Sequence, residues 1–82
     1  MDIPNLNAFV SGAETGSSSV ASDQRYLTQP AISKRVSALE TELDVQLFDR
    51  IGRKVTLTES GSALLSRART ILQQVEDSKL VI

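Results

Sequence analysis

The chain has 82 residues, with no Cys, no His and no Trp, and a hydrophobic fraction of 40%. This length allows one domain at most. The lack of Cys and His excludes a disulfide scaffold, a Cys/His zinc site, a Ser-His-Asp triad and a cysteine nucleophile, so we expect neither an enzyme nor a bound cofactor or metal. No apolar stretch approaches the ~18 residues that a membrane span needs, and Met1-Asp2-Ile3 does not open a signal peptide, so we expect an intracellular protein without a membrane partner.

The net charge of −1 conceals an uneven distribution. Residues 1–24 carry three acids and no base, residues 25–58 carry six bases and four acids, which gives +2, and residues 59–82 carry three of each. A solvated mixed-charge face explains such a pattern, and so do two contact points on one anion. The bases of the middle segment form two groups, Lys34-Arg35 and Arg50/Arg53/Lys54.

The first predicted helix runs from Leu6 to Ala13, because its apolar residues recur at the spacing of one helical face. Pro4 lies near its start, where a missing N–H costs least, and Gly16 is a plausible C-cap. The following Gly-Ser-Ser-Ser stretch has two interpretations. It is either a flexible linker or the start of a short helix, capped by Ser17 and ending at about Tyr26.

The next segment carries the clearest helix signal. Thr28 is the expected N-cap and Pro30 falls in the first turn, where its lost donor is tolerated. The helix should cover about residues 29–43, with small and polar side chains at the N-terminal end of its exposed face. Its apolar stripe is Ile32, Val36, Leu39 and Leu43.

A short two-stranded wing at about residues 49–57 follows, since the run Val55–Thr58 alternates apolar and polar residues and Gly52 sits where a hairpin would turn. The last helix opens at Glu59, capped by Thr58. Its ~24 residues are longer than so small a domain can cover, so we expect a partner, most simply a second copy of the chain. The chain stops on apolar residues 80–82 without a cap, which indicates a fragment of something longer.

These elements predict a helix-turn-helix over about residues 17–43, whose recognition helix enters the major groove of DNA. Gln29 offers an amide fork to adenine, the Pro30 ring and Ala31 can touch thymine methyl groups, and Ser33 can donate or accept. Each of these side chains is equally explained as an ordinary polar or small residue of a first helical turn.

The two basic groups fit the same model. Lys34 and Arg35 flank the exposed face and can neutralise phosphates, together with the positive end of the helix. Arg53 and Lys54 lie at the expected wing tip, which suits an adjacent phosphate or the narrow minor groove. The ordinary explanation is that they are solvated surface and turn residues, but the joint pattern favours DNA.

Long stretches of the chain resemble the N-terminal DNA-binding domain of LysR-type transcriptional regulators. The matching residues begin at Leu6 with Phe9-Val10, Glu14 and Gly16-Ser17, and they cover essentially the whole chain. The most specific parts are Thr28-Gln29-Pro30-Ala31-Ile32-Ser33-Lys34-Arg35-Val36, Leu39-Glu40, Leu43-Asp44-Val45-Gln46-Leu47-Phe48-Asp49-Arg50 and Leu57-Thr58-Glu59-Ser60-Gly61.

The resemblance implies a mostly α fold, a winged helix-turn-helix with a short two-stranded wing and a long C-terminal linker helix. Residues 1–58 would be the DNA-binding domain and residues 59–82 the dimerisation helix, followed after residue 82 by an effector-binding domain with a periplasmic-binding-protein-like fold. Antiparallel pairing of the linker helix would give homodimers, and full-length tetramers would bind an interrupted dyad in AT-rich promoter DNA. A small-molecule effector would bind only the missing domain, in a cytoplasmic, nucleoid-associated bacterial regulator.

The resemblance and the residues together give three sets of site residues. The expected DNA base contacts are Gln29, Pro30, Ala31, Ser33 and Arg53. The expected phosphate contacts are Ser17, Thr28, Lys34, Arg35, Arg50 and Lys54. The expected dimer interface is Leu64, Leu65, Ala68, Ile71, Leu72 and Val75.

Three departures from the family pattern fall on the expected short helix. Ser18 replaces an aromatic residue, Ser22 replaces the second residue of an Ala-Ala pair, and Arg25 replaces a leucine. All three changes are from apolar to polar, so we expect residues 17–26 to be the loosest element. The alternative function is therefore a protein-interaction or dimerisation module with a weakened or vestigial helix-turn-helix.

Overall fold

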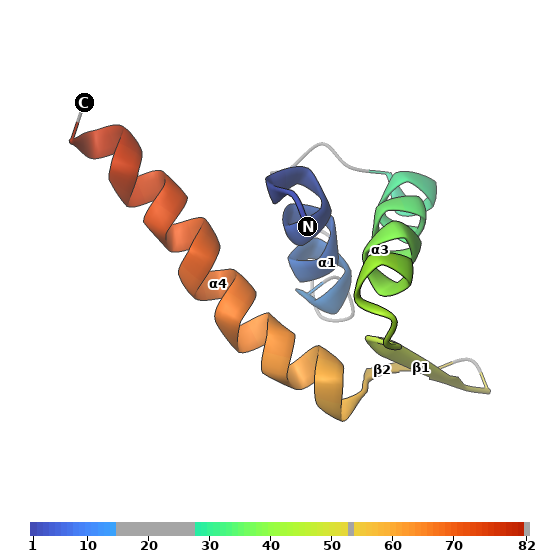
Figure 1. The fold of residues 1–82 in the computed structure, drawn as a ribbon. Helices are drawn as coiled ribbons and strands as arrows, with labels where there is room; N and C mark the ends of the chain where they lie inside the picture. Colours follow the sequence, from blue (N-terminus) through green and yellow to red (C-terminus); the bar gives the residue numbers. More distant parts are fainter. Residues whose placement is uncertain (15–27, 53, 82) are drawn as a thin grey trace.

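The computed structural model of the chain describes residues 1–14, 28–52 and 54–81. In the described residues, three helices and one two-stranded sheet follow in the order α1, α3, β1, β2 and α4 (Figure 1). This mostly helical architecture with a wing hairpin and a long last helix confirms the sequence prediction. The short helix or linker expected at residues 17–26 lies outside the described residues. None of the described helices is long and apolar enough to cross a membrane.

Helix α1 (Ile3–Glu14) is the centre of the fold and lies between α3 and α4 (Figure 1). The helix starts at Ile3, three residues before the predicted start at Leu6. The Asp2 carboxylate accepts the Asn5 backbone N–H at 2.9 Å, and this cap extends the first turn beyond the apolar stripe. Phe9 is fully buried, and its ring lies 5.4 Å from that of Phe48 at a tilted angle of 56°. This tilted aromatic pair connects α1 to the base of the wing.

Helix α3 (Gln29–Leu43) has the boundaries that the sequence predicts. The Thr28 hydroxyl accepts the backbone N–H of Ala31 at 3.3 Å. At the other end Asp44 adopts the left-handed conformation, with φ 56° and ψ 42°, and the backbone N–H groups of Asp44 and Val45 both donate to the Glu40 carbonyl. These two bonds satisfy one of the carbonyl groups that a helix end would otherwise leave without a partner.

Strands β1 (Phe48–Ile51) and β2 (Lys54–Leu57) form the predicted antiparallel hairpin, with Phe48 opposite Leu57 and Ile51 opposite Lys54. Gly52 follows β1 with φ +64°, a conformation that a side chain would strain. The strands are short and largely exposed, so the hairpin depends on its base for support, where Leu47 is fully buried and Phe48 and Leu57 contact the core.

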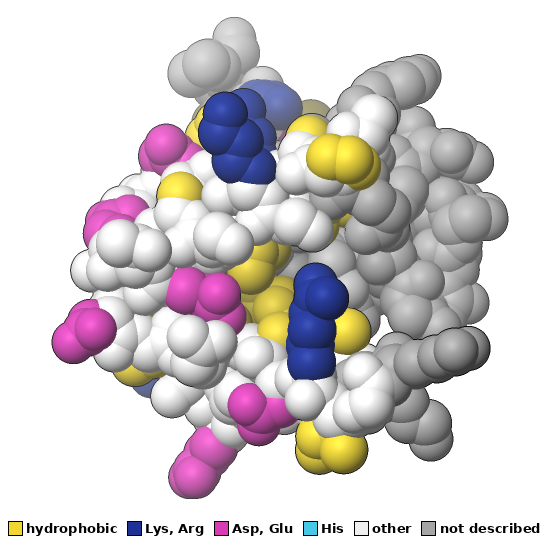
Figure 2. Space-filling view, turned by 90° about the vertical axis from the view of Figure 1, so that its right-hand side faces the viewer, with side chains coloured by type: hydrophobic (Ala, Val, Ile, Leu, Met, Phe, Trp, Pro, Cys, Tyr) yellow, Lys and Arg dark blue, Asp and Glu magenta, His cyan; other side chains and the backbone are white. Residues whose placement is uncertain are grey.

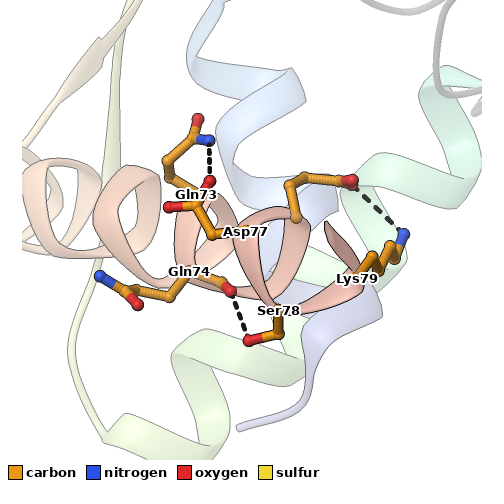
Figure 3. A network of polar contacts seen from close by, with 6 residues as sticks. Gln73, Gln74, Asp77, Ser78 and Lys79 are labelled. Carbon is orange, nitrogen blue, oxygen red and sulfur yellow. Dashed lines mark hydrogen bonds and ion pairs between the residues drawn. The ribbon is translucent and has the colours of Figure 1, made fainter. Parts of the chain in front are cut away.

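Helix α4 (Glu59–Leu80) starts at its predicted cap, since the Thr58 hydroxyl accepts the Gly61 N–H at 2.9 Å. Its first half packs against α1, and its C-terminal end projects away from the other elements (Figure 1). On that projecting part the stabilising contacts are local, as Figure 3 shows for Gln73 with Asp77, Ser78 with the Gln74 carbonyl, and Lys79 with its neighbour three residues earlier. Such contacts support a helix where no core covers it.

The buried core joins all the elements. It contains residues of α1 and α3, the residue before β1 and one residue of α4, and partly buried side chains of α4 surround it. The fully or nearly fully buried members are Leu6, Phe9, Val10, Ile32, Val36, Leu39, Leu47 and Ala68.

Candidate nucleic-acid interface

The N-terminal end of α3 presents an open surface. Pro30, Ser33 and Lys34 are exposed, and Ala31 is half-buried. The opposite face of the helix is fixed on the core by Ile32, which is 4% exposed. The small side chains therefore project from a rigid support, which is the arrangement that a helix needs to approach base edges closely.

The order of charges along α3 is opposite to the order that stabilises a helix. Acids are favourable at the positive N-terminus of a helix and bases at its negative C-terminus. Helix α4 follows this rule, with Glu59 in its first turn and Lys79 in its last. Helix α3 has no acid in its first turn and no base in its last turn, while Lys34 and Arg35 lie in its N-terminal half. No acid of α3 itself therefore occupies the positive end of this helix.

The acids of α3 lie in its C-terminal half and have partners within the chain. The Glu40 carboxylate accepts hydrogen bonds from the backbone at the base of the wing, and Glu42 pairs with the N-terminal ammonium group of Met1. Their negative charge is therefore placed at the end of α3 remote from the exposed residues Ser33 and Lys34.

The two neighbouring bases of α3 differ in their surroundings. The Arg35 guanidinium donates to the Asn5 side-chain oxygen of α1 at 3.3 Å. Lys34 is exposed, and in the described part of the chain no acidic side chain pairs with it. Lys34 is therefore free to meet an external phosphate, whereas Arg35 would exchange a weak internal hydrogen bond for one.

An open groove separates α3 from the wing. Ser33 and Ser37 line it from the helix, and Arg50 and Thr56 line it from the hairpin. Figure 2 shows this side of the molecule, with a hollow that has a hydrophobic floor, basic side chains above it and to its right, and acidic side chains to its left and below it. The structure thus brings Ser33 and Arg50, which are 17 positions apart in sequence, to the rims of one groove.

Four of the expected DNA-contact residues fall wholly or partly outside the described part of the chain. Ser17 and Arg53 lie outside the described residues. Gln29 and Lys54 have described backbone positions, at the start of α3 and of β2, while their side chains lie outside the description.

The predicted dimer residues on α4 divide into three groups. Ala68 is 0% exposed because its own chain encloses it, so its side chain is not available to a partner. Val75 is half-buried and does not belong to the side chains that pack on the core. The other four pack partly against the core while keeping some exposure: Leu64, Leu65, Ile71 and Leu72.

Sequence reasoning missed the connections at the base of the wing. The Glu40 carboxylate accepts the Leu47 N–H at 2.7 Å and the Phe48 N–H at 3.4 Å. From the other side, the Thr58 N–H donates to the Leu47 carbonyl at 3.0 Å, and the Thr58 hydroxyl donates to the Gln46 carbonyl at 2.6 Å. A sequence offers no signal for these bonds, because three of them join a side chain to a backbone group of another segment and the fourth joins two backbone groups that lie far apart in the chain.

Comparison with known proteins agrees with this architecture. A crystal structure of the BenM DNA-binding domain with catB site 1 DNA superposes with a TM-score of 0.85 at 31% identity, covering 99% of this chain and 91% of that one. The CbnR DNA-binding domain in its DNA complex superposes with a TM-score of 0.81 at 35% identity, covering 96% of this chain and 91% of that one. These matches confirm the winged helix-turn-helix fold.

The sequence relatives point to the same group. An uncharacterised helix-turn-helix-type transcriptional regulator of Azotobacter vinelandii, from the ibpB-leuC intergenic region, is 58% identical over 79 residues, which is 96% of this chain. The chain spans 55% of the length of that relative and about a quarter of the length of several others. The model of the family described as bacterial regulatory helix-turn-helix proteins, lysR family, matches residues 3–62. The chain therefore belongs to the LysR family of bacterial regulatory helix-turn-helix proteins, as a DNA-binding domain of that family and not as an enzyme.

Proposed function

We propose that this chain binds double-stranded DNA sequence-specifically, with α3 in the major groove and the wing at the adjacent minor groove. The observation that carries the proposal is the reversed order of charges on α3, which keeps acids away from its exposed N-terminal end. An arrangement that weakens an isolated helix is explained if a polyanion meets that end. The DNA complexes of the similar BenM and CbnR domains support the same conclusion.

In the proposed complex, side chains from the start of α3 read base edges, and bases on both elements hold the phosphates. The wing-tip arginine enters the minor groove, where arginine is favoured. The proposed base contacts are Gln29, Pro30, Ala31, Ser33 and Arg53. The proposed phosphate contacts are Ser17, Thr28, Lys34, Arg35, Arg50 and Lys54.

We further propose that two copies pair through α4. This helix extends beyond the core, and Val75 leaves apolar surface on it that the described core does not use. The site proposed for such a dimer is an interrupted dyad, because a two-fold protein fits a two-fold site, and the family resemblance implies that this site lies in AT-rich DNA. In this proposal residues 1–58 bind DNA, residues 59–82 dimerise, and a further effector-binding domain in the cytoplasmic full-length regulator supports tetramers and responds to a small molecule.

The test is DNA binding by the 82-residue chain as a function of salt, with duplexes selected from a randomised library and with unselected duplex. A DNA-binding domain loses affinity steeply as salt rises, by several powers of the salt concentration. Lys34→Ala should weaken binding to both duplexes and reduce the salt exponent by about one.

Lys79→Ala is the matched control, since it removes the same charge from an exposed position at the far end of α4. Lys79→Ala should change neither the binding affinity nor the salt exponent. A weak response of the wild-type chain that does not depend on salt would instead identify the chain as an interaction module with a vestigial helix-turn-helix.

A further inference from the structure

The wing is held at its base by apolar contacts that fix its position but not its direction. Leu47 is fully buried and Phe48 packs against Phe9. Apolar contacts are non-directional, so a hairpin held by them alone can tilt about its base. A strand rises about 3.3 Å per residue, so the last residue of a four-residue strand lies about 10 Å from the first, and a tilt of about 15° moves it by about 3 Å. This displacement is as large as a hydrogen-bond length.

One residue, Glu40, supplies the directional contacts that come from α3. The Glu40 Oε2 atom accepts the Leu47 N–H at 2.7 Å and the Phe48 N–H at 3.4 Å, and the Glu40 carbonyl accepts the Val45 N–H at 3.2 Å. A single residue therefore fastens both the loop after α3 and the first residue of β1 to the recognition helix. Hydrogen bonds from backbone N–H groups to a carboxylate are charge-assisted and depend strongly on angle.

Glu40 lies seven residues after Ser33 on the same rigid helix, which is about 10 Å along the helix axis. The Glu40 hydrogen bonds therefore connect the wing directly to α3, the helix that carries most of the proposed base contacts. Thr58 holds the same residue from the other side, because its backbone N–H donates to the Leu47 carbonyl at 3.0 Å. The peptide chain at Leu47 is thus fixed from α3 through its N–H and from the start of α4 through its carbonyl.

We infer that Glu40 is a positioning residue for DNA binding, which sets the direction of the wing relative to the recognition helix so that both reach the same duplex. This inference rests on the proposed function. It assigns to a negatively charged residue a favourable effect on the binding of a polyanion. Electrostatics alone predicts the opposite sign, because loss of an acid near DNA should strengthen binding.

Two conservative variants separate the effect of the Glu40 side-chain length from the effect of its negative charge. Glu40→Asp keeps the charge but shortens the side chain by one methylene, so the carboxylate no longer reaches the Leu47 N–H. Glu40→Gln removes the charge but keeps an oxygen that can accept the same hydrogen bond. Both variants of Glu42, an exposed residue of the same helix, serve as matched controls without a wing contact.

The first measurement is amide hydrogen exchange of the free 82-residue chain. Glu40→Asp should raise the exchange rate at Leu47 about tenfold while the amides of Leu39 and Val36 keep their protection, and Glu40→Gln should remain near wild type at Leu47. If Leu47 exchanges at the wild-type rate in Glu40→Asp, the Glu40 carboxylate does not hold the wing and the inference is overturned. This readout needs no DNA.

The second measurement is the salt dependence of binding to the selected duplex. Glu40→Asp should bind several-fold more weakly with a salt exponent smaller by about one, and Lys54→Ala in that background should reduce the exponent no further. Glu40→Gln should retain the exponent. If the exponent is unchanged in Glu40→Asp although Leu47 exchanges faster, the contact is structural only and the positioning role is refuted. If the wild-type chain shows no salt-dependent binding, the proposed function fails, while the exchange result still decides whether the contact exists.

Discussion

Replacing Gly61 by alanine tests how closely α4 must approach the base of the wing. A Cβ atom at this position would lie 2.1 Å from the Leu47 carbonyl oxygen and 3.0 Å from its carbonyl carbon. To relieve this overlap the start of α4 has to move by about 1 Å, since non-bonded carbon atoms prefer separations of about 3.5–4.0 Å. The obstacle is backbone, so no side-chain rotation relieves it.

The expected magnitude follows from three opposing terms. Overpacking costs about 1–3 kcal/mol, and displacing α4 weakens the two hydrogen bonds of Thr58 to Leu47 and Gln46, at about 1 kcal/mol each. Alanine regains about 1 kcal/mol because its helix propensity exceeds that of glycine. Gly61→Ala should therefore lower the free energy of unfolding by about 2–4 kcal/mol, and the melting temperature by at least about 10 °C.

The assay is thermal and urea unfolding followed by circular dichroism, with two controls. Ser62→Ala changes the next, exposed position of α4 and should stay within about 0.5 kcal/mol of wild type. Gly52→Ala meets no atom within 4 Å but has φ +64°, so it should cost only the backbone strain of about 1 kcal/mol. A Gly61→Ala variant as stable as wild type would refute the close approach of α4 to Leu47.

Three further predictions concern the N-cap of α3, the proposed contact of Gln29 with a DNA base, and the proposed dimer. Thr28→Ala should lower the free energy of unfolding by about 1 kcal/mol in a urea titration, since its hydroxyl caps α3, and an unchanged midpoint would contradict that role. Gln29→Ala should cost about 1–3 kcal/mol in binding to the selected duplex and relax preference at one base position; equal weakening on random duplex would count against base reading. Val75→Glu should abolish dimers in sedimentation without changing the stability of the monomer, whereas Leu72→Glu should reduce both, because Leu72 also packs on the core. If sedimentation shows an intact dimer for both variants, pairing through the apolar face of α4 is excluded.

The sequence alone located the elements whose signals are local. Both observed helix starts after a threonine, at Gln29 and Glu59, were predicted, because a capping hydroxyl and its target N–H lie three residues apart. The hairpin was predicted from alternation and from Gly52, with β1 starting one residue earlier than expected. The family resemblance was carried by residues of these same segments, and the match of the family model over residues 3–62 confirms it.

The tertiary structure decided which of these residues meet. Ala68 is enclosed by its own chain although its spacing equally suited a dimer stripe, because the stripe of α4 is shared between the core and the surface. Arg35 contacts Asn5 of α1, and Glu40 reaches the backbone of Leu47 and Phe48. Helical periodicity specifies a face but not the element that covers it, and a carboxylate bonded to backbone N–H groups requires no particular residue type in its partner. The sequence thus determined the helices, the wing and the family, whereas only the packing of segments far apart in the chain decided how the wing is held against the recognition helix.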